Sequence, residues 1–237
     1  LNLVDMSANL PPLYEQIALV DPLSDLEDQM MKDYRKVIQV VKDYEHHTHV
    51  NMMSVRNQFS LSYLDHPYGV PPILNPETGS EVCEPMDYHM LIEGDAMLAK
   101  EAKLVEIVKE ELGNNRNCVV YVEYSQDASS NVLFRLQELL CRECGLEEQE
   151  VIVMQSGYPS ALKREEWMHD RAREGMRVMI CNPRLCETGL DFCWEEEGKV
   201  YNYPNLIFYQ IGYSLFVVWQ AARSEEHTSE LQSHHRI

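Results

Sequence analysis

Short apolar runs alternate with amphipathic stretches through the second half of the chain. Helical spacing of apolar residues predicts a helix over residues 96–112 and another over about 128–144, with Gly145 as its C-terminal cap. Further helices are predicted to begin near Ser160 and Ser214. Between the helices, short apolar runs predict four strands: Cys118–Val122, Val151–Met154, Arg177–Cys181 and Leu206–Tyr209. Strands that alternate with helices need crossover connections, so the pattern predicts an α/β fold, a parallel sheet with helices on both faces.

The first part of the chain has a different pattern. Ile17–Val20 predicts a short strand, and apolar residues at helical spacing from Leu26 to Val41 predict one long amphipathic helix. Residues 57–95 hold five prolines and no sustained period, which predicts a loop-rich connection. We therefore place a domain boundary near Gly94, between a helical and loop-rich linker over residues 1–94 and an α/β domain over residues 95–222.

Composition narrows the class of protein. The chain has 237 residues, 45% of them hydrophobic, which is enough for one core. Its sequence contains no apolar run of the ~20 residues that span a bilayer and no signal peptide at its start, so we expect a cytoplasmic protein without a membrane partner. Seven cysteines without a repeating spacing predict reduced thiols. Cys141 and Cys144 form a CxxC pair, but no second pair or His cluster follows at zinc-site spacing, which disfavours a metal site.

Charge restricts how the chain can bind nucleic acid. The formal net charge is −19, whereas free-standing nucleic-acid binding normally needs clustered Lys and Arg. Any such contact must therefore be local, or shared with a partner domain.

Small polar residues follow three of the predicted strands. Val119–Ser125 ends in Ser125, the next strand leads into Gln155-Ser156-Gly157, and Val178–Phe192 carries Thr188, Gly189 and Asp191. In parallel sheets ligands bind where the carboxyl ends of strands meet the loops, so these groups predict a ligand-binding edge. The alternative is that turns simply favour such residues.

The order of these segments resembles a known family. Val119–Ser125, Gln155–Gly157 followed by Arg164, and Val178–Phe192 are similar to motif IV, the next strand and glycine turn, and motif V of superfamily 2 helicases, closest to Swi/Snf-type DNA translocases. Val218–Arg223 resembles the approach to motif VI, and Gln220 its first residue. Upstream, Leu10–Glu15 and Asp65–Tyr68 resemble the stretch that joins the two lobes. The chain thus resembles the inter-lobe linker and the second, RecA-like lobe of that family.

The resemblance implies roles for particular residues. It places Gly189 and Asp191 near ATP, and Ser125, Ser156, Gly157 and Thr188 near the nucleic-acid backbone. It also implies ATP and Mg²⁺ as cofactors and a nucleic acid, expected to be DNA, as partner of the complete two-lobed protein. Hydroxyls and backbone N–H groups bind phosphates without reading base edges. Two departures put the subfamily in doubt: Asn182-Pro-Arg stands where many relatives have Ser or Thr with Lys, and Asp191 where they have Asn.

Three elements of the family are missing from these 237 residues. No phosphate loop and no acidic Mg²⁺-binding strand occur, which the family carries on its N-terminal RecA-like lobe. The two arginines of motif VI, worth on the order of 10³ to 10⁵ in rate, do not follow Gln220. We assign no catalytic residue and expect this chain to be inactive alone. Residues 223–233 are instead the translation of a nucleotide sequence that resembles a sequencing-library adapter. We therefore interpret residues 223–237 as an artefact rather than a His-rich metal-binding tail.

Two other functions stay open. One is a non-catalytic acidic α/β interaction module, whose binding to basic partners would be salt-sensitive and independent of nucleotide. The other is an unrelated nucleotide-binding α/β enzyme, which the lack of a Gly-x-Gly-x-x-Gly after any strand disfavours.

Overall fold

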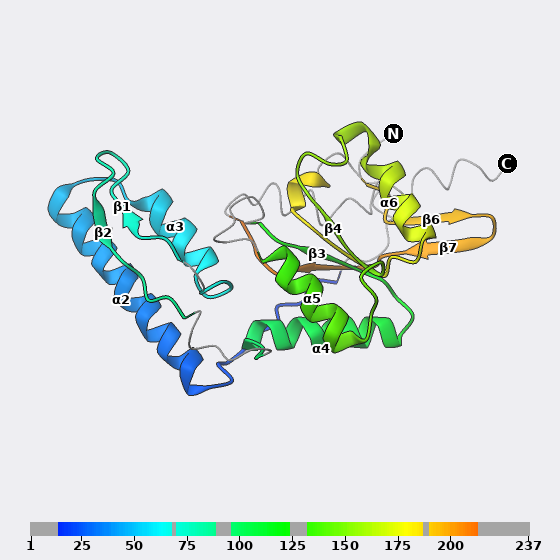
Figure 1. Ribbon diagram of the computed structural model, residues 1–237, viewed down its shortest axis with the longest axis horizontal. Coiled ribbons are helices and arrows are strands. Elements are labelled where there is room, and N and C mark those ends of the chain that lie inside the picture. Colours follow the sequence, from blue (N-terminus) through cyan, green and yellow to red (C-terminus); the bar gives the residue numbers. More distant parts are fainter. Residues whose placement is uncertain (1–13, 68–69, 89–95, 124–131, 187–189, 213–237) are drawn as a thin grey trace. The chain divides into compact units, whose positions relative to one another are not determined.

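The computed structural model describes residues 14–67, 70–88, 96–123, 132–186 and 190–212. It divides into two compact units (Figure 1). The sheet unit comprises Leu1–Leu19, Val105–Glu123 and Gln137–Ile237, and the helical unit comprises Val20–Leu104 and Tyr124–Leu136. The predicted boundary near Gly94 lies outside the described residues. The division into residues 1–94, 95–222 and 223–237 stays a prediction.

A four-stranded parallel sheet forms the centre of the sheet unit. Its strand order is β4-β5-β3-β8, and all three neighbouring pairs are parallel and in unbroken register. The strands are β3 (Cys118–Tyr121), β4 (Val151–Met154), β5 (Val178–Cys181) and β8 (Asn205–Phe208). All four predicted strands are confirmed to within one residue at each end.

Both faces of this sheet are covered. Every residue of β3 and β5 is 0% exposed, and since successive side chains point to opposite faces, neither face meets solvent there. Val119 and Tyr121 pack in one cluster with Met168 of α6 (Arg164–Arg173). Figure 1 shows α4 (Ala99–Gly113) and α5 (Leu133–Cys144) on one side of the sheet and α6 on the other. The predicted α/β class, a parallel sheet flanked by helices, is confirmed.

The helices end where the sequence indicates. Gly145 follows α5 with φ 67°, and Leu146 N donates to Cys141 O at 3.1 Å, so the predicted glycine cap is present. The helix predicted near Ser160 begins as the 3-10 turn η1 (Ala161–Lys163) and continues as α6. The start of the helix predicted over 128–144 and the one predicted from Ser214 lie outside the described residues.

An antiparallel hairpin interrupts the path from β5 to β8. It consists of β6 (Cys193–Glu196) and β7 (Lys199–Asn202), joined by Glu197 and Gly198 at φ 51° and 80°. Two positive φ values in a two-residue connection suit the right-handed twist of the hairpin. Trp194 stacks between His169 of α6 and Tyr201, with ring centroids 3.9 and 4.8 Å away. The sequence analysis did not predict this hairpin, whose two halves are each partly exposed.

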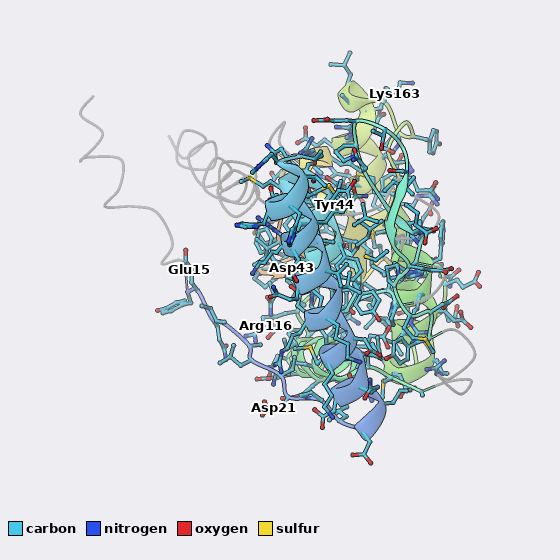
Figure 2. All side chains as sticks on the ribbon, turned by 90° about the vertical axis from the view of Figure 1, so that its left-hand side faces the viewer. Glu15, Asp21, Asp43, Tyr44, Arg116 and Lys163 are labelled. Atoms are coloured by element: carbon cyan, nitrogen blue, oxygen red, sulfur yellow. The ribbon has the colours of Figure 1, made fainter. Side chains whose placement is uncertain are left out.

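The helical unit is built on one long helix. The predicted helix over Leu26–Val41 is confirmed as α2 (Asp25–Thr48), capped at its start by Ser24, whose side chain accepts from Glu27 N. The stretch predicted to be loop-rich holds most of α3 (Met53–Ser62) and the hairpin of β1 (Ile73–Leu74) and β2 (Glu81–Cys83). Asn75, beside β1, donates from Nδ2 to the hydroxyl of Tyr44 at 2.8 Å. Figure 2 labels Tyr44, which lies on α2.

The short strand predicted at Ile17–Val20 is wrong. Residues 14–20 have no regular secondary structure, and Ile17 and Leu19 are 86% and 89% exposed. An apolar run becomes a strand only where another strand pairs with it, and the sheets of the described residues do not include this segment. None of the described helices has the length and apolar character that a membrane crossing needs.

Candidate functional site

The strand order marks one place on the sheet where a ligand site is expected. From β3 the chain passes over β5 to reach β4, and from β5 it passes back over β3 to reach β8. The connections that leave β3 and β5 therefore run in opposite directions. In open α/β sheets, ligands bind at the carboxyl ends of the strands at such a switch point. The residues that follow β3 and β5 are thus the first candidates.

Asn182 joins these two strand ends. It follows β5 directly and is 9% exposed. Its Nδ2 donates to the backbone carbonyl of Glu123, two residues beyond β3, at 2.5 Å. Its Oδ1 accepts from Arg184 N at 2.9 Å, which shapes the 3-10 turn η2 (Pro183–Leu185). One buried amide thereby fixes the backbone after both central strands.

An acidic and a basic side chain meet at the same place. Arg184 Nη2 lies 3.6 Å from Glu123 Oε1, and the two side chains are 62% and 16% exposed. Gly212, beyond β8, closes over the carboxylate: a Cβ at this position would lie 2.7 Å from Glu123 Cδ and 2.8 Å from Oε2. Only glycine fits there without displacing Glu123.

The loop after β4 is tied to the same region. Arg164, the first residue of α6, donates from Nη1 to the carbonyl of Leu185 in η2 at 3.2 Å. Arg164 therefore links the helix that follows β4 to the turn that follows β5.

Ser156 and Gly157 lie in an exposed turn directly after β4. Tyr158 N reaches Gln155 O at 3.4 Å, and Gly157 has φ 94°, a conformation that glycine adopts without strain. Since β4 neighbours β5, this turn is at the carboxyl edge, as expected. Their contact with nucleic acid stays a prediction.

Asp191 has a local structural role. Its Oδ1 accepts from Cys193 N at 2.8 Å, which closes the turn leading into β6, and the residue is partly buried. Contact with a nucleotide through the other oxygen stays a prediction. The other predicted site residues, Ser125, Thr188, Gly189 and Gln220, lie outside the described residues.

Two cysteines lie beside this edge without forming a reactive centre. Cys181 Sγ and Cys186 Sγ are 3.6 Å apart and buried. The hydrogen bond with Cys186, together with burial, raises the pKa of Cys181 well above its ordinary value, so the thiol stays protonated and is a poor nucleophile. For the CxxC pair, burial raises the pKa values of Cys141 and Cys144, and carboxylates near Cys141 add to its shift.

A metal site is a separate question. Within the described ranges, no three His, Cys, Asp or Glu side chains come together as ligands for a metal ion. Mg²⁺ stays a prediction for the complete protein, and we assign no step of the chemistry to a metal bound by these residues.

The sequence analysis did not select Glu123, Asn182, Arg184 and Gly212 as site residues. A local signal exists for two of them, since Glu123 and Asn182 are the first charged or strongly polar residues after two wholly apolar runs. The approach of Gly212 to Glu123 has no local signal, because it joins segments that are distant in sequence. Comparison with known proteins finds no matching family model, curated protein or solved structure.

Proposed function

We propose that the chain is the second RecA-like lobe, with its linker, of an ATP-dependent nucleic-acid translocase of the superfamily 2 helicase type, acting on DNA. One observation carries this proposal. The three segments that resemble motif IV, the glycine turn and motif V leave β3, β4 and β5, which are parallel and adjacent in the order β4-β5-β3. Three separate sequence matches thereby meet at one edge, where a shared ligand can contact all of them.

The chemistry of this edge suits a grip on phosphates. Ser156 offers a hydroxyl and the turn at Gly157 offers backbone N–H groups, both exposed. Arg184 adds a cation in η2, the turn that follows β5, and β5 pairs with β4. Such groups bind the sugar-phosphate backbone and ignore base identity, as a protein that moves along DNA requires.

The nucleotide belongs to the complete protein. In this proposal Gly189 and Asp191 approach ATP, while the missing first lobe holds its phosphates and Mg²⁺. The contribution of this chain is to bind one side of the ligands, and closure and reopening of two lobes around ATP drive the movement.

The first test is binding of a fluorescein-labelled DNA duplex, measured by anisotropy as a function of salt. We expect binding that weakens as salt rises, because phosphate contacts release counterions. Ser156→Ala should weaken it, while Ser80→Ala, an exposed serine of the helical unit, should not. Binding to polylysine in place of DNA would instead favour the acidic interaction module, for which the net charge of −19 is the supporting observation.

The second test is the sequence of the source gene beyond both ends of this chain. We expect a phosphate loop and an acidic strand upstream in the same frame, and two arginines soon after Gln220-Ala-Ala222. A continuous frame without these motifs would contradict the ATP-dependent part of the proposal.

A further inference from the structure

Arg184 is held more loosely than the other arginines that pair with carboxylates. Its Nη2 is 3.6 Å from Glu123 Oε1, beyond hydrogen-bond distance. By contrast, Arg116 pairs with Glu111 through two bonds of 2.6 Å, and Arg173 pairs with Glu196 through bonds of 2.7 and 2.8 Å. The Arg184 side chain is also 62% exposed. Its guanidinium can therefore turn to another anion at small cost.

Glu123, in contrast, is largely buried. Its backbone carbonyl accepts from Asn182, and its carboxylate lies against Gly212, with both oxygens within 3.0 Å of the place a Cβ would take. The side chain is 16% exposed. A largely buried carboxylate thus lies next to an exposed guanidinium, at the switch point between β3 and β5.

This arrangement has a direct chemical consequence. A guanidinium forms its strongest bonds with a planar or tetrahedral oxyanion that it can contact through two N–H groups, and phosphate is such an anion. The distance to Glu123 does not allow that contact in the ligand-free protein. We propose that Arg184 binds a phosphate group at the carboxyl edge of the sheet, and that Glu123 is an internal competitor which must be displaced from Arg184.

The inference rests on the proposed function for the source of the phosphate, which is either the DNA backbone or the nucleotide. The chemistry is the same for both. Glu123 weakens binding in two ways, since it attracts Arg184 and repels the incoming anion. Its removal should therefore have the opposite effect to the removal of Arg184.

The test compares Arg184→Gln, Glu123→Gln and the double variant in the full chain. Three probes are titrated: the labelled DNA duplex, a fluorescent ATP analogue and inorganic tripolyphosphate. We expect Arg184→Gln to weaken binding about tenfold and to reduce the slope of log affinity against log salt by about 1. Glu123→Gln should strengthen binding about threefold, and this gain should vanish in the double variant because it acts through Arg184.

Controls separate the inference from general charge effects. Arg173→Gln removes an exposed arginine in the last turn of α6, which leads to the amino ends of the strands, and should leave binding unchanged. Arg184→Lys keeps the charge but not the two-point contact, so it should restore only part of the affinity. Thermal unfolding of each variant should match the original chain, since Arg184 is exposed and Gln has the shape of Glu.

The probes also distinguish the two proposals. Dependence on Arg184 with DNA alone identifies the backbone as the source, and dependence with the ATP analogue alone identifies the nucleotide. If only tripolyphosphate binds in an Arg184-dependent way, the phosphate site stands and the proposed function fails. If DNA binds and Arg184→Gln changes nothing, the inference is overturned and the proposed function survives. Unchanged affinity in Glu123→Gln would refute the competition.

Discussion

Different kinds of interaction join the segments within each of the two units. In the sheet unit, adjacent strands pair through backbone hydrogen bonds in unbroken register, and β3 and β5 are wholly buried. In the helical unit, hydrogen bonds that involve side chains also join segments that are distant in sequence. Asp65 accepts from Lys100 at 2.8 Å, and Glu27 accepts from Ala99 N, 72 residues away, at 2.7 Å. Tyr88 donates to Asp33 of α2.

Aromatic side chains form part of the apolar core of the helical unit, together with aliphatic residues such as Val41 and Met52. Tyr34 of α2 stacks on Phe59 of α3 with centroids 5.9 Å apart, and Phe59 lies 4.7 Å from Tyr63. Polar bonds surround this cluster, as when the Tyr63 hydroxyl donates to Met86 O at 3.1 Å. Buried apolar side chains are present in both units, but in the helical unit polar pairs between distant segments add to the apolar core. The predictions below test that contrast.

The largest effect is expected in the sheet. Ile180 lies in β5 between β4 and β3 and is 0% exposed. Ile180→Ala removes buried methyl groups and leaves a cavity, which should lower the free energy of unfolding by about 3 kcal/mol. Urea unfolding followed by circular dichroism measures this loss. The matched control is Val200→Ala on the exposed hairpin, where the side chain is 61% exposed and little change is expected.

Glu101 tests the polar connections of the helical unit. This residue is 1% exposed, accepts from Leu98 N at 2.9 Å, and accepts from Arg135 Nε and Nη2 at 2.5 and 3.0 Å. Glu101→Gln should cost about 2 kcal/mol because the partly buried guanidinium of Arg135 loses its counter-charge. Glu143→Gln, which alters a pair between neighbours on the surface of α5, serves as the control. Equal urea midpoints for both variants would contradict the contrast between the units.

Tyr44 tests another side-chain hydrogen bond between distant segments of the helical unit. Its hydroxyl accepts from Asn75 Nδ2, and Asn75 Oδ1 in turn accepts from Glu77 N and Thr78 N, which forms the turn between β1 and β2. Tyr44→Phe deletes only the hydroxyl and should cost about 1 kcal/mol. Tyr158→Phe, on a side chain that is 71% exposed in the sheet unit, should cost nothing measurable in the same urea experiment.

The smallest expected effect is a dependence of the folding stability on pH in the acid range. Hydrogen bonds from Lys36 and Tyr88 lower the pKa of Asp33 from 3.8 to about 2. Because the folded pKa is depressed, the stabilisation is fully present above pH 3.8 and is lost as pH falls through about 2. Tyr88→Phe should therefore reduce the acid-dependent part of the stability. Urea midpoints between about pH 6 and about pH 2 measure it, and an unchanged pH profile would exclude Asp33 as its source.

The sequence predicts an element well where the signal is local, and poorly where the element depends on a distant partner. The four strands and the cap at Gly145 were predictable because apolar runs and glycine act locally. The strand predicted at Ile17–Val20 was wrong because nothing in a short run specifies a pairing partner. The β6–β7 hairpin was missed because Trp194 is the one buried residue among its eight strand residues, which gives only a weak pattern. For Ser125, Thr188, Gly189 and Gln220, their predicted roles remain untested.

The sequence by itself determined the class of the fold, the elements of its sheet and the small polar groups that end its strands. These features depend on periodicity and on single residues, which are readable from neighbours in the chain. Only the tertiary structure decided the order β4-β5-β3-β8, and with it the meeting of Glu123, Arg184 and Gly212. The physical reason is that pairing between strands is chosen by contacts between distant segments. Glu123, Arg184 and Gly212 come close to one another at the carboxyl edge of the sheet only because β3, β5 and β8 lie side by side.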